Sequence, residues 1–402
     1  MQQKKLPLEG IRVLEVGQLI AAPFAGMMLA SFGAEVIKIE PPGSGDPMRS
    51  WRKLHNGTSL WWYSISRNKK SVTLNLREEE GQKLFKKLVE KDVDVIVENF
   101  RPGRMEKWGL GYEDLKEINP GIIMVRVSGW GQTGPYAKEP GFASTAEGRG
   151  GLRYVTGEPD QPPVRSGISL GDSLAALHAV IGTLSAVYHR DVNNSGQGQV
   201  VDTAIYESVF NMMESMLPEY DLLGHVRERS GAKLAGIVPS STYQCKDGTY
   251  LIIGGNNDSI FKRLMNTIER PDMAEDERLA HNPGRVEHEK EIDAAISSWV
   301  GKKSFEEALA ALKEAEVPAG PIYSIEEIVK DPQYIARNMF EVVQLPDGTD
   351  MKIPAVSPKL SKTPAQTRWI GPELGAHNKE VWSDLAGVEE DALASLKESG
   401  II

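Results

Sequence analysis

Asp172 is the residue of this sequence best placed to act as a nucleophile. It follows Gly171 and stands at the start of an apolar run whose spacing of three and four residues predicts one helix stripe: Leu174, Leu177, Val180, Ile181, Leu184 and Val187. We expect Asp172 at or near the helix N-cap, where unpaired backbone N–H groups and the helix dipole favour the ionised carboxylate. Aspartate is also a common capping residue, so this pattern alone leaves a purely structural role open.

Three arginines lie between a glycine-rich stretch and Asp172, namely Arg149, Arg153 and Arg165. A guanidinium can hold a carboxylate through two parallel hydrogen bonds, so one of them is expected to bind the distal carboxylate of a dicarboxylic substrate. Each could equally be a solvated loop charge. His281 and His288 are spaced like possible metal ligands, but no cysteine or third histidine is nearby, so no metal site is predicted.

The first third of the chain alternates strand and helix patterns. Strands are expected at 11–16, 35–40, 71–76, 93–98 and 122–128, and helices at 23–32 and 78–90. This alternation predicts an α/β fold whose large domain contains a Rossmann-like, doubly wound parallel sheet. The turn after the first strand lacks the G-x-G-x-x-G of dinucleotide-binding folds, which disfavours a nicotinamide dehydrogenase.

The pattern changes after a predicted helix at 205–223. Asp247-Gly248 predicts a hairpin between strands 242–245 and 250–253, followed by helices at 260–268, 287–300 and 305–315. A second hairpin is expected within 340–353, and two short helices close the chain. The domain prediction is a large domain over 1–224 that includes a linker helix, a smaller α+β domain over 225–322, and a C-terminal segment over 323–402.

Composition excludes several classes of partner. The 402 residues are 40% hydrophobic and 25% charged, which is typical of a globular protein too long for one core. A net charge of −10 disfavours nucleic acid and acidic membranes. Cys245 is the single cysteine, so no intrachain disulfide can form. Residues 1–5 begin no apolar signal run and no run reaches membrane-spanning length, so a cytoplasmic protein is expected.

Seven sequence blocks occur in a fixed order: LEGIRVL (8–14), APFA (22–25), GAEVIKIE (33–40), ENFRPG (98–103), SGWGQTGPY (128–136), GD (171–172) and GQGQ (196–199). Together they resemble the class III CoA-transferases, the family of formyl-CoA transferase and carnitine CoA-transferase. The resemblance implies transfer of CoA from an acyl-CoA to a free carboxylic acid, with a dicarboxylate such as succinate as one expected partner. CoA and acyl-CoA would be substrates, and no permanently bound cofactor is expected.

The resemblance assigns the nucleophile role to Asp172. Its carboxylate would attack the donor thioester and go on to form an aspartyl-CoA thioester. Gly254 and Gly255 resemble the glycine loop that closes over this intermediate in formyl-CoA transferase, and their backbone N–H groups are expected to face the oxyanion. In this chain two asparagines follow them, and a plain hairpin or helix-capping turn is the alternative interpretation.

The same resemblance indicates a CoA-binding surface in the large domain. Arg101 and Lys107 match two cationic positions that contact CoA in carnitine CoA-transferase, and they follow the strand at 93–98. The other residues expected to contact CoA are Gln18, Ala21, Leu74, Asn75, Leu76, Arg77, Asn99 and Phe100. The resemblance also implies that segment 323–402 returns to the large domain and that two subunits interlock as a homodimer.

Two alternatives remain. An acyl-CoA racemase or epimerase of the same fold needs a His-Asp pair shortly after the fifth block, but this chain has Gly141-Phe142-Ala143-Ser144 there and no histidine from 72 to 177. A second alternative is a CoA-binding subunit that forms no covalent adduct. The residue pattern favours the transferase.

Overall fold

The computed structural model describes residues 6–91 and 93–402, so the expectation about residues 1–5 lies outside the described part. The chain divides into two compact units. The first contains the described residues of Met1–Leu152, together with Ser166–Glu214 and Ile335–Ile402; the second contains Arg153–Arg165 and Ser215–Tyr334. The second unit therefore begins ten residues before the predicted boundary at 225 and includes an earlier loop. Helix α9 (Met216–Leu223) has no buried residue, which explains why it does not belong to the large unit.

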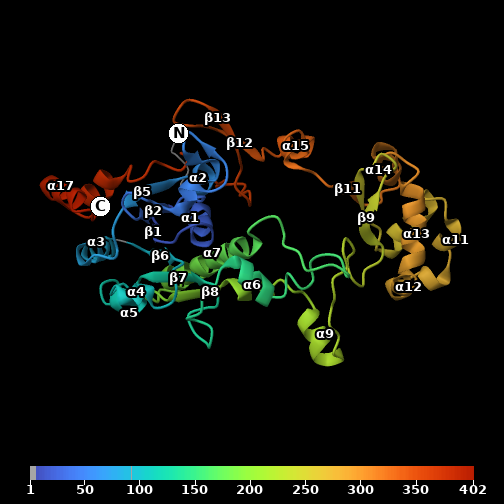
Figure 1. Ribbon diagram of the computed structural model, residues 1–402, viewed down its shortest axis with the longest axis horizontal. Coiled ribbons are helices and arrows are strands. Elements are labelled where there is room, and N and C mark those ends of the chain that lie inside the picture. Colours follow the sequence, from blue (N-terminus) through green and yellow to red (C-terminus); the bar gives the residue numbers. More distant parts are fainter. Residues whose placement is uncertain (1–5, 92) are drawn as a thin grey trace. The chain divides into compact units, whose positions relative to one another are not determined.

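Six parallel strands form the sheet of the first unit (Figure 1). They are β1 (Arg12–Glu15), β2 (Glu35–Glu40), β5 (Lys69–Thr73), β6 (Val95–Glu98), β7 (Ile123–Ser128) and β8 (Val200–Ala204). Their order is β5-β2-β1-β6-β7-β8, and a typical register pairs Leu14 of β1 with Ile37 of β2 and with Ile96 of β6. The predicted α/β fold with a parallel sheet is confirmed. Strand β8 was not predicted, because it is a short edge strand whose five residues are mostly exposed or half-buried.

The strand order changes direction between β1 and β6. Strands β1, β2 and β5 follow one another toward one edge, whereas β6, β7 and β8 follow one another toward the other edge. In open α/β sheets, ligands bind outside the carboxyl ends of the strands at such a switch point. The turn after β1 and the loop after β6 are therefore the segments that the topology favours for ligand binding.

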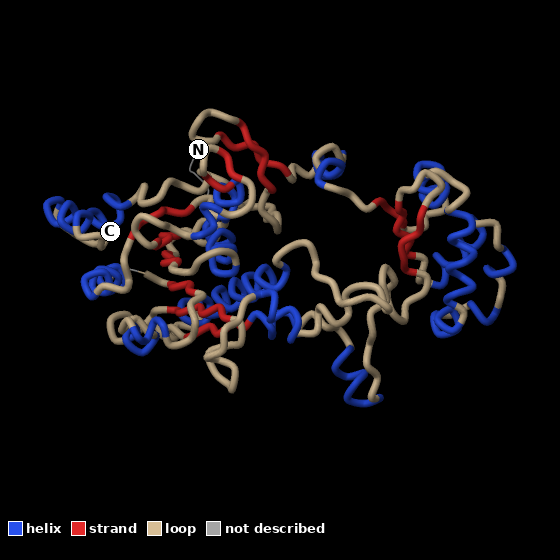
Figure 2. Tube along the Cα trace, viewed as in Figure 1, coloured by secondary structure: helices blue, strands red, loops and turns tan. Residues whose placement is uncertain are grey.

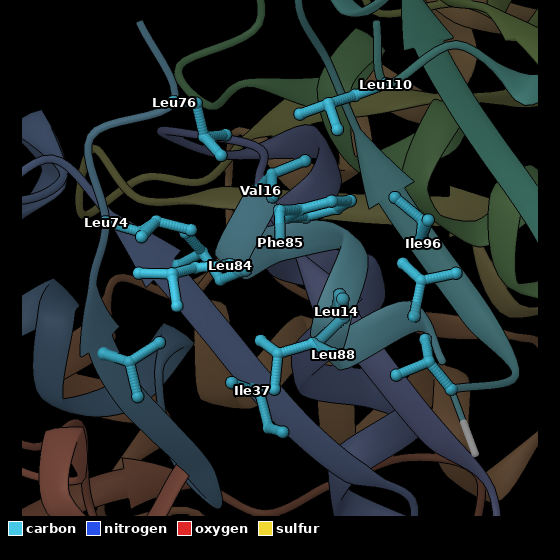
Figure 3. Close-up of a cluster of buried hydrophobic side chains, with 14 of the residues drawn as sticks. Leu14, Val16, Ile37, Leu74, Leu76, Leu84, Phe85, Leu88, Ile96 and Leu110 are labelled. Carbon is cyan, nitrogen blue, oxygen red and sulfur yellow. The ribbon is translucent and has the colours of Figure 1, made fainter. Parts of the chain in front are cut away.

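One face of the sheet packs against helix α3 (Glu79–Val89). Figure 3 shows Leu84, Phe85 and Leu88 of this helix beside Leu14 and Ile37 of the strands. The other elements on this side are α4 (Arg104–Lys107), α5 (Tyr112–Lys116), a π-helical turn (Glu380–Leu385) and α17 (Glu390–Glu398). The C-terminal segment thus contributes Trp382 and the last two isoleucines to the core of the first unit.

The opposite face is covered by α1 (Ala21–Ser31), α6 (Ala143–Arg149), α7 (Leu170–Asp191) and α8 (Ile205–Phe210). The buried face of α7 consists of small residues, chiefly Ala175, Ala176, Ala179 and Ala186. The predicted apolar stripe is only partly buried: Val180 and Val187 pack against the core, whereas Leu177, Ile181 and Leu184 are 40%, 62% and 41% exposed. Small side chains allow α7 to approach the sheet and the alanine-rich α1 closely, which leaves its large apolar residues outside.

Two further expectations need correction. By length and composition α7 could span a membrane, contrary to the prediction that no run reaches that length. Its alanine face nevertheless packs in the core of the first unit. The predicted single helix at 205–223 is two helices, α8 and α9, because Glu214 between them adopts a left-handed conformation with φ 49° that no α-helix continues.

The second unit is built around a three-stranded antiparallel sheet, seen at the right of Figure 2. Its strands are β9 (Ser240–Gln244), β10 (Tyr250–Gly254) and β11 (Ala319–Pro321), so the predicted Asp-Gly hairpin is confirmed. The helices of the second unit are α9, α10 (Asp258–Thr267), α11 (Pro271–Ala274), α12 (Asn282–Glu287), α13 (Glu289–Val300), α14 (Phe305–Glu314) and α15 (Ile325–Ile328), and α16 (Pro332–Ala336) crosses its boundary.

Short elements complete the first unit. A hairpin of β3 (Leu54–His55) and β4 (Thr58–Ser59) precedes helix α2 (Leu60–Ile65). The second predicted hairpin is confirmed as β12 (Phe340–Gln344) and β13 (Asp350–Pro354).

A carboxylate is buried at the end of β6. Glu98 is 1% exposed, its Oε1 lies 2.8 Å from Nε of Arg126, and its Oε2 accepts a hydrogen bond of 2.6 Å from the N–H of Phe100. Burial raises the pKa of Glu98 to about 7, although the Arg126 guanidinium beside it acts in the opposite direction.

This shift predicts a pH dependence of stability. Between the ordinary value of 4.5 and about 7, the folded chain binds more protons at Glu98 than the unfolded chain, so the free energy of unfolding falls as pH rises through this window. The contribution is at most about 3 kcal/mol. Urea unfolding midpoints of the wild type should fall from pH 5 to pH 8, and Glu98→Gln should show a shallower fall. Identical slopes would contradict the prediction.

Candidate active site

Asp172 lies in the first turn of α7, at the carboxyl edge of the sheet. The other end of α7 is fixed at the amino edge, where Arg190 donates to Asp94 at 2.7 Å and to the carbonyl of Gly121 at 3.1 Å, just before β6 and β7. A helix of 22 residues is about 33 Å long, so it carries Asp172 to the opposite edge. The N-cap is Ser169, so Asp172, the third helical residue, lies near the N-cap and three positions after it.

The backbone before Asp172 is held by a buried carboxylate. Oε1 of Glu147, a residue of α6 that is 1% exposed, accepts a hydrogen bond of 3.1 Å from the N–H of Gly171. A Cβ on residue 171 would lie 3.1 Å from Cγ of Glu147 and 3.1 Å from Cγ2 of Ile205, so glycine permits this close approach. The role of Glu147 was not predicted, because no sequence spacing links a residue of one helix to the first turn of another.

The turn after β1 and the loop after β6 meet at the switch point. Gln18 lies in that turn, and its backbone N–H and carbonyl both bond to the side chain of Asn99, each at 2.8 Å. The structure thus brings together two residues that were predicted to contact CoA. Ala21 begins α1, and its methyl group is buried in the core, so only its backbone could face a ligand.

The segment after β5 is only partly available to a ligand. Leu74 and Leu76 are 2% and 8% exposed and belong to the core, so their side chains do not form a binding surface. Asn75 is half-buried, and its N–H donates to the carbonyl of Ile401 at 2.8 Å. Arg77 is exposed. A contact between this segment and CoA would therefore use Asn75, Arg77 or the backbone.

The loop after β6 presents two exposed cations, Arg101 and Lys107. Phe100, predicted as a CoA contact, packs against the core and edge-on against Trp108, with ring centroids 5.3 Å apart. Arg101 lies in the loop at the carboxyl edge, and Lys107 ends the short helix α4 that follows it. Two positive charges at this edge suit an anionic ligand.

Gly254 and Gly255 lie in the second unit, whereas Asp172 lies in the first. Their backbone N–H groups already have acceptors, the carbonyls of Pro318 and Pro239, each at 2.9 Å. In this conformation they are not free to stabilise an oxyanion. The turn instead leads from β10 to α10, where the Asn257 side chain caps the helix by accepting from the N–H of Ser259.

A buried arginine holds this turn in place. Arg285 is fully buried, and its guanidinium donates to carbonyls of Val238, Leu279, Ala280 and Asn256 and to Asp258. All five of its N–H donors therefore have an acceptor. The structure thus supports the helix-capping interpretation of the turn.

Of the three arginines, Arg149 belongs to the same unit as Asp172. Its guanidinium carbon lies 3.9 Å from the ring centroid of Tyr136 and 4.6 Å from that of Trp130. Glu139 lies 3.8 Å away, at the long end of an ion pair, and the Arg149 side chain is 45% exposed. Arg153 and Arg165 lie in the second unit.

The histidines have local partners. Nδ1 of His178 lies 2.8 Å from the carbonyl of Leu174, one turn earlier in the same helix. His281 contacts Asp258, and His288 contacts Arg278. Within residues 6–91 and 93–402, no three His, Cys, Asp or Glu side chains gather as a metal site would require.

Comparison with known proteins gives a consistent result. A sequence model described as CoA-transferase family III matches residues 8–378. The chain is 50% identical over 402 residues to the succinyl-CoA–D-citramalate CoA-transferase of Chloroflexus aurantiacus, covering 100% of this chain and 99% of that protein. It is 41% identical over 403 residues to the alpha subunit of succinyl-CoA–L-malate CoA-transferase from Chloroflexus aurantiacus, covering 100% and 94%.

The crystal structure of a CAIB/BAIF family protein from Brucella suis has the same fold, with a TM-score of 0.82 at 32% identity over 95% of this chain and 100% of that one. The family match extends over nearly the whole chain, through the sheet and the Gly171-Asp172 turn that were described above. The chain therefore belongs to CoA-transferase family III and is a CoA-transferase.

Proposed function

We propose that this enzyme transfers CoA from succinyl-CoA to a dicarboxylic acid through a covalent intermediate on Asp172. The two Chloroflexus relatives act, by their names, with succinyl-CoA on D-citramalate and L-malate, which are both hydroxylated dicarboxylates. The observation that carries the proposal is the position of Asp172, a half-buried carboxylate in the first turn of a helix at the carboxyl edge of a parallel sheet.

The proposed reaction has four balanced steps. The Asp172 carboxylate attacks the succinyl thioester, which forms a mixed anhydride and releases the CoA thiolate. The thiolate attacks the aspartyl carbonyl of the anhydride, so that succinate leaves and an aspartyl-CoA thioester remains. The acceptor carboxylate then attacks this thioester, which forms a second anhydride and releases the CoA thiolate again. The returning thiolate attacks its acceptor carbonyl, which yields the new acyl-CoA and regenerates Asp172.

Arg149 is the residue that we propose for the distal carboxylate of the acceptor. Two aromatic rings lie against its guanidinium, and Glu139 approaches it only at 3.8 Å, so a carboxylate of the acceptor could replace this long ion pair. A positioned guanidinium binds a carboxylate with a smaller loss of side-chain entropy than a mobile one.

We also propose a homodimer. Leu177, Ile181, Leu184 and Tyr188 form an exposed apolar face along α7, and helix α9 has no buried residue at all. Contiguous apolar surface of this kind marks an interaction site in a globular protein. The family resemblance supports a second copy of the chain as its partner.

The first prediction concerns Asp172. Incubation with succinyl-CoA should add the mass of CoA to the peptide that contains Gly171-Asp172, and hydroxylamine should release it, because an aspartyl thioester is an activated acyl group. Asp172→Ala should form no adduct and lose at least about 1,000-fold in kcat, while it keeps CoA affinity. Asp191→Ala, at the other end of the same helix, is the matched control and should keep the adduct. Near-normal turnover of Asp172→Ala would refute the mechanism.

A second prediction tests the acceptor site. Arg149→Met should raise KM for a dicarboxylate acceptor by about 10-fold to 100-fold with little change in kcat, because the lost interaction binds a non-reacting end of the substrate. KM for a monocarboxylate such as butyrate should stay unchanged. Arg368 stacks on Trp369 with a carbon-to-centroid distance of 4.9 Å, so Arg368→Met controls for the loss of a stacked arginine. An equal rise for both acceptors would remove Arg149 from this role.

A third prediction tests the oligomeric state. Light scattering during size-exclusion chromatography should give the mass of two chains for the wild type. Ile181→Glu should give the mass of one chain, because the buried carboxylate would have no partner at the interface. Val342→Glu, at an exposed apolar position on β12, controls for the added charge. A wild-type protein that elutes as one chain would exclude the dimer.

A further inference from the structure

The turn between β1 and α1, residues 17–20, is buried or half-buried and is fixed by several hydrogen bonds. It lies at the switch point of the sheet, where the loop after β6 leaves beside it. Leu19 in this turn adopts φ 65°, in the left-handed region that non-glycine residues rarely occupy. Such a conformation persists only where the surrounding structure enforces it.

Asn99 supplies the first restraint. Its Nδ2 donates to the carbonyl of Gln18 and its Oδ1 accepts from the N–H of Gln18, both at 2.8 Å. One amide thus satisfies both backbone groups of a single residue, as a neighbouring β-strand would do. The pair of bonds ties the turn after β1 to the loop after β6.

Asp46 and Lys38 supply the second restraint. The N–H of Leu19 donates to both carboxylate oxygens of Asp46, at 3.1 and 3.3 Å, and Nζ of Lys38 donates to the carbonyl of Gly17 at 2.9 Å. Asp46 and Lys38 are each 1% exposed and form an ion pair of 2.8 Å with one another. Because Asp46 is buried and Lys38 is its ion-pair partner, Asp46 cannot turn away from the backbone without leaving its own charge uncompensated.

These restraints leave the side-chain amide of Gln18 unused. Among the described residues no side chain or backbone group forms a hydrogen bond with it, and Gln18 is half-buried at the carboxyl edge. Both polar groups of the Asn99 amide, by contrast, are engaged with the backbone. Of these two residues, Gln18 has the amide without a hydrogen bond to the described part of the chain, whereas one donor and one acceptor of the Asn99 amide are already committed to the backbone.

We propose that Asn99 is a positioning residue that acts through Gln18 and does not contact CoA itself, and that Asp46 and Lys38 complete the clamp. The clamp fixes the backbone of Gln18 at the switch point, and with it the direction in which the side chain leaves the turn. A mobile turn would have to be ordered each time substrate binds, and misplacement of a binding group by about 1 Å can lower the rate by about 100-fold. This inference rests on the proposed function for its kinetic test.

A double-mutant cycle tests the proposal. Asn99→Ala and Gln18→Ala should each lower kcat/KM for succinyl-CoA by roughly 10-fold or more. Because Asn99 acts only through Gln18, the kcat/KM of the double variant should equal that of Gln18→Ala within about twofold. Effects that multiply in the double variant would show that Asn99 contacts substrate independently and would overturn the proposal. So would a Gln18→Ala variant with unchanged kinetics.

Asn119 offers a matched control. It makes the same kind of bonds at the amino edge, where its Nδ2 donates to the carbonyl of Val93 at 2.9 Å and its Oδ1 accepts from the N–H of Gly121 at 3.0 Å. Asn119→Ala should lower the melting temperature as Asn99→Ala does, with kcat/KM unchanged. This comparison separates positioning from general destabilisation.

Hydrogen exchange supplies a measurement that needs no activity. The Gln18 and Leu19 amides should exchange at least tenfold faster in Asn99→Ala than in the wild type, and at the wild-type rate in Asn119→Ala. Unchanged exchange in Asn99→Ala would overturn the clamp. If the wild type transfers no CoA but this exchange difference is found, the proposed function fails while the clamp stands.

Discussion

Charges buried beneath the carboxyl edge of the sheet determine how the turn after β1 is shaped. Lys38 lies 2.9 Å from Glu15 and 2.8 Å from Asp46, and Lys69 lies 2.8 Å from Glu15. Burial alone would lower the pKa of Lys38, but the carboxylates of Asp46 and Glu15 raise it above its ordinary value, whereas burial lowers the pKa of Lys69 to about 8. A Cβ at Gly26 would lie 1.9 Å from Oε2 of Glu15, so α1 can pass this cluster only because residue 26 is glycine.

Helix α7 connects the two edges of the sheet. Arg190 fixes its last turn beside β6 and β7, and its small side chains let it lie close to the sheet, so the position of its first turn follows from its length. Glu147 then holds the peptide before Asp172. The position of the proposed nucleophile therefore follows from helix geometry and from one buried carboxylate. The exposed apolar face of α7 is the surface proposed for the partner subunit.

In the second unit, the glycine turn does not have the free N–H groups that the family resemblance implies. This turn occupies the expected place in the sequence, yet both glycine N–H groups bond to proline carbonyls and Arg285 anchors the carbonyl of Asn256. A role in oxyanion stabilisation would require these bonds to be exchanged. The cations and the dicarboxylate-binding arginine proposed for the first unit do not depend on such a change.

The local sequence pattern determined the alternation of strands and helices in the large unit, both hairpins, and the position of Asp172 at the start of a long helix. These features follow from periodicity and turn chemistry, which act over a few residues. Tertiary structure alone decided which face of α7 is buried, since that depends on how closely alanines let it approach the sheet. It also placed Leu74 and Leu76 in the core and joined Asn99 to Gln18. These contacts depend on strand order, which is set by pairing between segments distant in the chain and leaves no local signal.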